Sequence, residues 1–426
     1  MLRSAFVTCR RALVPAVILL ALGLAAGAHA QTKLTVGVFP DYDSFMREVG
    51  PLFEEMYPDI QLEVQTLGFQ DHHNALLTAL ATGSGAPDVV AIEIGYLGRF
   101  ASGGGLTDLS QEPFRAGELS GKFAPFAWGL VNTLDGRIIA IPTDSAPGTM
   151  FYRIDVLEAA GLDINEVETW DDLVQLGHKV TRDTDGDGVV DTFLITDAGQ
   201  IAQAMIRGNI PEGEGLYFDV NGRPLVDSPR FVNAFKRAQE VRLAGLDARI
   251  GAWSNEWYEA FNRGITAVEI SGAWLAGHLQ NWMAPDTKGL WRVRHLPENM
   301  YVNWGGTFWA IPEQSQQKEA AWKFIQFAAL RPDIQVKAFT TIHAYPALLE
   351  ALDHPVFFEG VEFLGGQQAR LLWSETVANI SVISIHPGDP VASEIVDSAL
   401  GEVLSEGRAV EDALAEARML IERRLR

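Results

Sequence analysis

Acidic and aromatic side chains gather where three predicted strands end. The strands are expected over residues 33–39, 60–64 and 88–92, and the side chains that follow them are Asp41, Tyr42, Asp43, Asp71, Glu93 and Tyr96. Carboxylates accept hydrogen bonds from hydroxyl groups, and such charge-assisted bonds are strong. Aromatic rings cover an apolar face at low entropic cost. Together these groups suit a polyhydroxylated ligand.

Each acid also has an ordinary structural explanation. Asp41, Asp43 and Asp71 precede helical patterns and could cap those helices. We expect one cap and one ligand contact from Asp41 and Asp43. Glu93 leaves a buried strand toward a glycine-rich turn, where a structural role for a carboxylate is harder to find. Glycoside hydrolases also use paired acids, but these acids lie on separate loops without an evident acid/base pair.

The segments that carry these side chains alternate between strand and helix periodicity. A helical pattern runs from Phe45 to Met56 and stops near Pro58, and a second lies around 75–80. The run 88–92 is apolar throughout, as in a strand covered on both faces. This order predicts an α/β fold with a mostly parallel sheet, in which ligands bind at the carboxyl ends of the strands.

The later part of the chain contains a second set of elements. Strands are predicted at 268–272 and 304–312, a helix at 320–330 and a helical tail at 393–425. The segment 141–148 carries two prolines and a glycine, which favour an extended crossing between two lobes. A chain of 426 residues exceeds what one hydrophobic core usually organises, so two lobes are expected.

Residues 1–30 are typical of a cleavable export signal. Basic residues precede an apolar core at 13–26, and Ala28-His29-Ala30 offers small residues at the exit. A retained membrane helix is the rival interpretation, but the core is short for a span. Since no cysteine follows the core, we expect a periplasmic protein without a lipid anchor. Cys9 is the only cysteine, which leaves the mature chain without disulfides or cysteine-bound metal.

The formal net charge of −22 excludes nucleic acid binding through a general electrostatic field. We expect a monomer that requires no cofactor. One acidic loop could hold structural calcium, because Asp183, Asp185, Asp187 and Asp191 occupy positions 1, 3, 5 and 9 of an EF-hand-like pattern. Position 12 is Leu194, so the usual bidentate ligand is missing.

Several segments in this order resemble one family. They are residues 50–110, 139–144 leading to 150–155, 269–274, 304–312 and the final helix through Gly407. The chain resembles the family 1 extracellular solute-binding proteins, the maltose-binding-protein-like sugar receptors of ABC importers. The resemblance implies two α/β lobes, a hinge of several crossings and a ligand cleft between the lobes. It also implies a permease partner in the inner membrane and no catalysis.

The resemblance places the first lobe at residues 31–141 and 268–331 and the second at 142–267 and 332–426. It favours Asp144, on the crossing segment, as a sugar-binding acid, and Trp274 and Trp304 as stacking platforms. Gly305 and Gly306 would let the backbone approach the ligand closely. Further candidates from the second lobe are His343, Tyr345, Trp373 and His386.

Two further tryptophans, Trp253 and Trp257, are expected to serve packing. The nature of the cargo stays open: a mono- to oligosaccharide is favoured, and a polyol, a polyamine or a glycerol phosphate derivative is the alternative. A secreted glycoside hydrolase is the less favoured hypothesis for the same residues.

Overall fold

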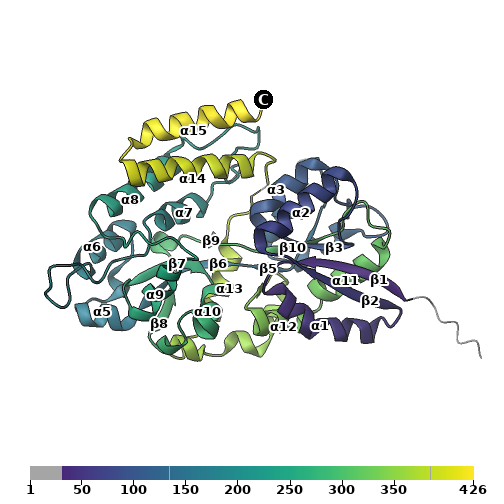
Figure 1. The fold of residues 1–426 in the computed structure, drawn as a ribbon, viewed down its shortest axis with the longest axis horizontal. Coiled ribbons are helices and arrows are strands. Elements are labelled where there is room, and N and C mark those ends of the chain that lie inside the picture. The colour runs from purple at the N-terminus through teal and green to yellow at the C-terminus, as the bar shows by residue number, and fades with distance from the viewer. Residues whose placement is uncertain (1–30, 134, 384) are drawn as a thin grey trace, which may run out of the picture.

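The computed structural model describes residues 31–133, 135–383 and 385–426. The expected export signal lies outside these residues. Within the described ranges, no helix has the length and apolar character that crossing a membrane requires. The described residues form two main sheets, each covered by helices, and one two-stranded sheet, and Figure 1 shows the two main sheets in the right and left halves of the molecule.

The first sheet has the strand order β2-β1-β3-β10-β4. Its members are β1 (Thr32–Val38), β2 (Ile60–Thr66), β3 (Val89–Glu93), β4 (Ile141–Pro142) and β10 (Thr307–Ala310). The strands β1, β2 and β3 run parallel, which confirms the predicted start of the chain, while β10 is antiparallel to both β3 and β4. The carboxyl ends of β1, β2 and β3 therefore meet at one edge of this sheet.

Helices cover both faces of the first sheet (Figure 1). They are α1 (Tyr42–Met56), α2 (Phe69–Thr82), α3 (Ile94–Gly103), α4 (Pro125–Val131), α11 (Lys318–Leu330) and α12 (Pro332–Ile342). The helical period of α1 buries Phe45, Val49 and Phe53. The ring of Phe53 meets Phe324 and Phe327 of α11 in edge-on contacts, which fixes the two helices on the same face.

The second sheet is antiparallel, with β6 (Pro147–Arg153) at its centre. Its partners are β7 (Val268–Gly272), β8 (Trp291–Arg294) and β9 (Val302–Asn303). We expected residues 268–331 in the first lobe, but the pairing of these three strands with β6 places 268–303 on the second sheet. The helix α12 packs against α1, so the chain also leaves the first lobe later than residue 332. Contacts between distant segments, strand pairing in the first case and helix packing in the second, decide these differences.

Helices also cover the second sheet. They are α5 (Ile154–Ala160), α6 (Trp170–Val180), α7 (Gly199–Arg207), α8 (Pro229–Leu243), α9 (Asn255–Arg263), α10 (Trp274–His278), α13 (Ala369–Asn379), α14 (Asp389–Glu406) and α15 (Val410–Arg424). The helical tail predicted at 393–425 is thus two helices. It breaks at Gly407, whose φ of 69° suits a glycine that ends a helix.

Short extended segments join the two halves. The chain leaves the first sheet after β4, pairs as β5 (Asp144–Ser145) with β11 (Tyr345–Pro346), and enters β6. It returns from β9 to β10 through residues 304–306. The extended crossing predicted at 141–148 is therefore confirmed. Two crossings that lie side by side act as a hinge, because few backbone torsions must change for the lobes to rotate.

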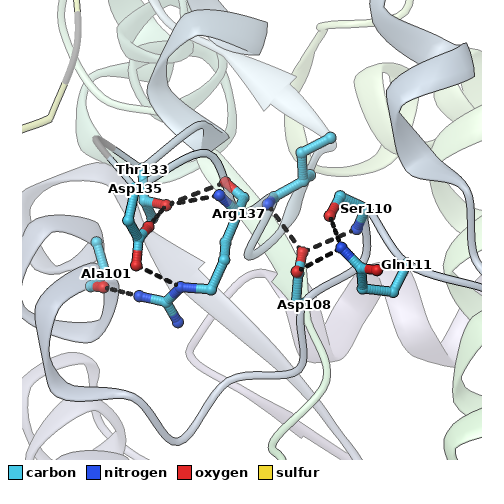
Figure 2. Close-up of polar contacts among 8 residues, drawn as sticks. Ala101, Asp108, Ser110, Gln111, Thr133, Asp135 and Arg137 are labelled. Carbon is cyan, nitrogen blue, oxygen red and sulfur yellow. Dashed lines mark hydrogen bonds and ion pairs between the residues drawn. The ribbon is translucent and has the colours of Figure 1, made fainter.

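A set of polar contacts anchors the end of α3 (Figure 2). The guanidinium of Arg137 donates to the carbonyl of Ala101 at 3.0 Å and to Asp135 at 2.9 Å. Nearby, Asp108 accepts from the backbone N–H groups of Ser110 at 3.0 Å and Ile138 at 3.2 Å. These bonds hold α3 in place, and the N-terminus of α3 carries the candidate site.

Candidate functional site

The first-lobe side of the site begins with a buried tyrosine and an acid. Tyr42 opens α1 and is 4% exposed, and its ring meets Trp309 edge-on at 5.6 Å. Burial raises the pKa of Tyr42 well above its usual value, and the charge of Asp144 adds to this shift. The carboxyl of Asp144 accepts the backbone N–H of Thr307, and burial raises its pKa to about 7.

A second acid lies where β3 passes into α3. The carboxylate of Glu93 accepts the N–H of Gly95 at 2.7 Å and so caps α3. Burial raises the pKa of Glu93 to about 7. Beside it, the ring of Tyr96 stacks on His73 at 3.9 Å, and His73 accepts the N–H of Glu93 at 3.1 Å. The N–H of Gly95 therefore holds the carboxylate of Glu93, and the imidazole of His73 holds its backbone.

The crossing at 304–306 brings a tryptophan and an arginine to the same place. The guanidinium of Arg207, at the end of α7, lies 5.3 Å from the ring centroid of Trp304. Its positive charge acts against the rise in the pKa of Glu93. Gly305 and Gly306 have φ of 130° and 128°, a backbone conformation that favours glycine.

A cavity of about 140 Å³ lies at this junction. Its lining combines first-lobe residues such as Gly95 and Phe126 with second-lobe residues such as Arg207, Tyr217 and Asp389. Burial raises the pKa of Asp389 to about 7. A hollow with walls from both lobes can stabilise one arrangement of the lobes when a ligand fills it.

The second lobe adds a wall of aromatic rings. The indole Nε1 of Trp274 donates to the carbonyl of Trp304 at 3.1 Å, and Trp253 stacks on Trp274 at 5.4 Å. His278, one turn further along, feels the charge of Asp41 on the first lobe. Asp41 is exposed at the N-cap position of α1, with φ of 74°, and its side chain forms no capping bond. The wall thus borders the crossing at 304–306.

The structure places several predicted site residues elsewhere. Asp43 pairs with Arg47 at 2.6 Å along α1, and Asp71 is exposed in the first turn of α2, where Gly68 holds the cap position. Tyr345 and Trp373 are 1% and 2% exposed, so both are interior side chains. Ligand contact by these two residues stays a prediction.

Their hydrogen bonds explain the burial of these two rings. The hydroxyl of Tyr345 bonds Ser374 at 2.6 Å, and the indole of Trp373 donates to Thr149 at 3.2 Å.

The two predicted histidines also have structural partners. His343 ends α12 with φ of 56°, and its ring bonds Asn281 at 3.2 Å. His386 stacks on Phe218 at 4.0 Å, and its Nδ1 accepts the N–H of Gly388 at 3.0 Å. For both residues, ligand contact stays a prediction.

The acidic loop partly matches the calcium pattern. Carboxylate oxygens of Asp183, Asp185 and Asp187 lie within 4.8 Å of one another. Asp191 instead accepts from the backbone and hydroxyl of Thr184, both at 2.7 Å. Backbone N–H groups already bond Asp183, including Gly188 at 2.7 Å. Calcium binding stays a prediction, and a calorimetric titration would check it.

Sequence reasoning missed three contributors and misjudged one. Arg207, His73 and His278 were not singled out, because each gains its place from a distant partner. The packing role expected for Trp257 is confirmed at 2% exposure. The packing role expected for Trp253 is wrong, because Trp253 is 55% exposed. One sequence signal for these aromatic rings was available: two tryptophans, at 253 and 257, lie before and within a short helix.

Two rigid α/β halves, a hinge of short crossings and a hollow lined from both sides define a two-lobed solute receptor. Residues 37–332 match the model of the bacterial extracellular solute-binding proteins, and the chain belongs to this family. A solved structure of an extracellular solute-binding protein of family 1 superposes with a TM-score of 0.80 at 22% identity, covering 92% of this chain and 99% of that one.

Curated relatives extend over most of the chain. An arabinooligosaccharide-binding protein of Halalkalibacterium halodurans is 28% identical over 385 residues, which cover 87% of this chain and 84% of the relative. A lactose-binding protein of Rhizobium radiobacter is 27% identical over 80% of both chains. The predicted family and fold are thereby confirmed.

Proposed function

We propose that the protein captures a carbohydrate between its lobes and delivers it to the permease of an ABC importer. One observation carries this proposal: Arg207 of the second lobe lines a hollow with walls from both lobes, and its guanidinium lies 5.3 Å from the ring of Trp304 on the crossing. The buried carboxyl of Glu93 lies in the first lobe next to Ile94 and Gly95, which line the same hollow. Carboxylates and a guanidinium bond sugar hydroxyls, and an indole covers the C–H face of a sugar ring. The ligands named for the two curated relatives support a carbohydrate over other solutes.

We propose further that the protein does not catalyse a reaction. In a glycoside hydrolase one acid must be free to transfer a proton and the other to attack or activate water. Here the carboxylates of Glu93 and Asp144 both accept backbone N–H groups, which suits fixed hydrogen-bond acceptors. Incubation with aryl glycosides tests this role, and turnover that disappears in Glu93→Gln would overturn it.

We propose that the protein acts in the periplasm and carries no lipid anchor. The support is the export pattern of residues 1–30 and the absence of cysteine after its apolar core. Mass spectrometry of the secreted protein would identify the mature N-terminus, expected at Gln31. A diacylglycerol mass on the protein would contradict the proposal.

Isothermal titration calorimetry tests the carbohydrate itself. The panel is arabinotriose, lactose and maltotriose, with mannitol, spermidine and glycerol 3-phosphate as the other cargo classes. We expect at least one sugar to bind with a Kd of about 1 µM or below, about −8 kcal/mol. Binding of only mannitol, spermidine or glycerol 3-phosphate would assign another cargo to the same fold.

A further inference from the structure

Strands β1 and β3 separate before they reach the candidate site. They pair in register only as far as Gly37 and Val90, whereas β3 continues to Glu93. The N–H of Ile94 bonds on the β10 side of the strand. Because the backbone groups of a strand point alternately to its two sides, those of Ala91 and Glu93 point to the side that β1 has left. Buried backbone groups of this kind need another partner.

Two adjacent histidines on α2 take the place of the missing strand. Nε2 of His72 donates to the carbonyl of Ala91 at 2.7 Å. Nε2 of His73 accepts the N–H of Glu93 at 3.1 Å. Both histidines are buried, with 4% and 1% of their surface exposed. The first bonds the middle of β3, and the second bonds the residue whose carboxylate belongs to the candidate site.

The partners of His73 determine where its ring carries a proton. Nδ1 lies 2.7 Å from the carbonyl oxygen of Phe69, which can only accept, so Nδ1 is protonated. Nε2 meets a backbone N–H, which can only donate, so Nε2 is not protonated. Burial lowers the pKa of His73 to about 4, which keeps the imidazole neutral at neutral pH. His72 has the opposite tautomer, because its Nε2 donates to a carbonyl.

Aromatic neighbours hold the ring of His73 in this orientation. It stacks on Tyr96 with ring centroids 3.9 Å apart and an interplanar angle of 10°. Phe39 and Phe69 contact it at 5.5 and 5.0 Å. An imidazole that is packed on several sides keeps Nε2 at one position, so it also fixes the backbone of Glu93.

We propose that His73 is a positioning residue for ligand binding: its unprotonated Nε2 replaces the missing strand and fixes Glu93 beside the cavity. This inference rests on the proposed carbohydrate function, in which Glu93 accepts from sugar hydroxyls. A carboxylate that is already in place does not have to be ordered when the sugar binds. Without the acceptor on His73, the sugar itself would have to order the end of β3.

Calorimetry with variants of His73 tests this role. The probe is the member of the panel arabinotriose, lactose and maltotriose that binds the wild type most tightly. We expect His73→Asn to raise its Kd by about three- to tenfold, the effect of ordering a side chain on binding. The amide of asparagine can bond Phe69 but is too short to reach Glu93. His73→Gln should retain most of the affinity, because its Oε1 is as many bonds from Cβ as Nε2 of histidine is.

His72→Asn is the matched control. It removes the same ring from the neighbouring position, but the partner of His72 is Ala91, in the interior of β3. A merely structural role would lower the melting temperature of both asparagine variants and leave Kd unchanged. We expect Kd to rise only in His73→Asn. In a Glu93→Gln background the same substitution should have a smaller effect, because the carboxylate that His73 positions is then absent.

The tautomer can be tested without any sugar. Long-range proton–nitrogen NMR spectra of protein with isotope-labelled histidine report which ring nitrogen carries the proton, and the two asparagine variants assign the signals. We expect the proton on Nδ1 of His73 and on Nε2 of His72. A proton on Nε2 of His73 would contradict the positioning role, whatever the ligand is.

The outcomes separate the two proposals. If no sugar of the panel binds the wild type, the carbohydrate function fails, and the positioning role fails with it. If a sugar binds but its Kd is unchanged in His73→Asn, rises equally in His72→Asn, or rises equally in the Glu93→Gln background, the positioning role alone is wrong. Melting curves confirm that each variant is folded. If His73→Asn does not fold, His73→Phe, which keeps a ring without an acceptor, is compared with His73→Gln, and equal affinities would overturn the role.

Discussion

The guanidinium of Arg207 lies over the ring of Trp304 in the candidate site, with its Cζ atom 5.3 Å from the ring centroid. Its Nε and one terminal nitrogen donate to Gln203 at 3.2 and 3.1 Å, which leaves further N–H donors for a ligand. The pairing connects a helix end to the crossing at 304–306. The lobe junction therefore contains a cation in a chain whose net charge is strongly negative.

Replacing either member of this pair should weaken ligand binding. We expect Arg207→Ala and Trp304→Ala each to raise the Kd for the bound sugar by about tenfold or more, because each removes a large interface side chain. Calorimetry measures the change. Arg418→Ala is the control, since Arg418 pairs with Asp227 and Glu422 on α15. An unchanged Kd in both variants would show that the ligand binds elsewhere.

Ligand binding should depend on pH through Asp144. In the free protein the pKa of Asp144 is about 7, so the carboxyl is mostly protonated at lower pH. A sugar hydroxyl that donates to this carboxyl favours the ionised form, and the affinity should rise with pH through 7 by up to about tenfold per unit. The rise should be weaker in Asp144→Asn, because one fewer carboxyl with a pKa of about 7 then titrates near the cavity, and Glu93 and Asp389 remain. A steeper rise in the variant would contradict the assignment.

The buried carboxyl of Glu269 should make stability depend on pH. Burial raises its pKa to about 7, although Thr196, Trp257 and Gln200 donate to it. The folded protein then binds more protons than the unfolded chain between about pH 4.5 and 7, so stability should fall as pH rises through this range. Glu269 accounts for at most about 3 kcal/mol of this fall in the free energy of unfolding. Chemical denaturation of wild type and Glu269→Gln at several pH values checks this, and equal slopes would contradict it.

Two glycine substitutions should act in opposite directions. Gly306 has φ of 128°, and an added Cβ would lie 3.2 Å from the carbonyl oxygen of Asp144, so Gly306→Ala should cost about 1–3 kcal/mol. Gly401 lies exposed within α14 with no atom near its absent Cβ, and Gly401→Ala should add about 1 kcal/mol. Denaturant unfolding measures both. A stable Gly306→Ala variant would show that the crossing tolerates a side chain.

Local periodicity was enough to predict the start of the fold. The strands near 33–39, 60–64 and 88–92 and the helix ending at Met56 were correct, because their apolar spacing is a property of neighbouring residues. The partner of β7 was not predicted correctly. The sequence at 268–272 reveals the periodicity of a strand, but it does not reveal which strand pairs with it. Pairing with β6 depends on contacts between distant segments.

The same distinction between local patterns and contacts of distant segments applies to the candidate site. The proximity of Tyr42, Glu93 and Tyr96 was predictable, because residues at the carboxyl ends of parallel strands share one edge. The burial of Tyr345 and Trp373 could not be predicted, because a polar aromatic residue looks the same in sequence whether it faces a cleft or the interior. Trp253 was misjudged because its exposure follows from a left-handed turn at one residue, which helical spacing does not reveal.

The ends of the described chain belong to different lobes. Thr32 begins β1 in the first sheet, and α15 packs on α14 and α8 beside the second, with its C-terminus at the outer edge in Figure 1. Fluorescent labels attached at Gln31 and Arg426 would sit on separate lobes. A change in energy transfer between them would then report capture of a sugar in real time, without altering any side chain that touches it.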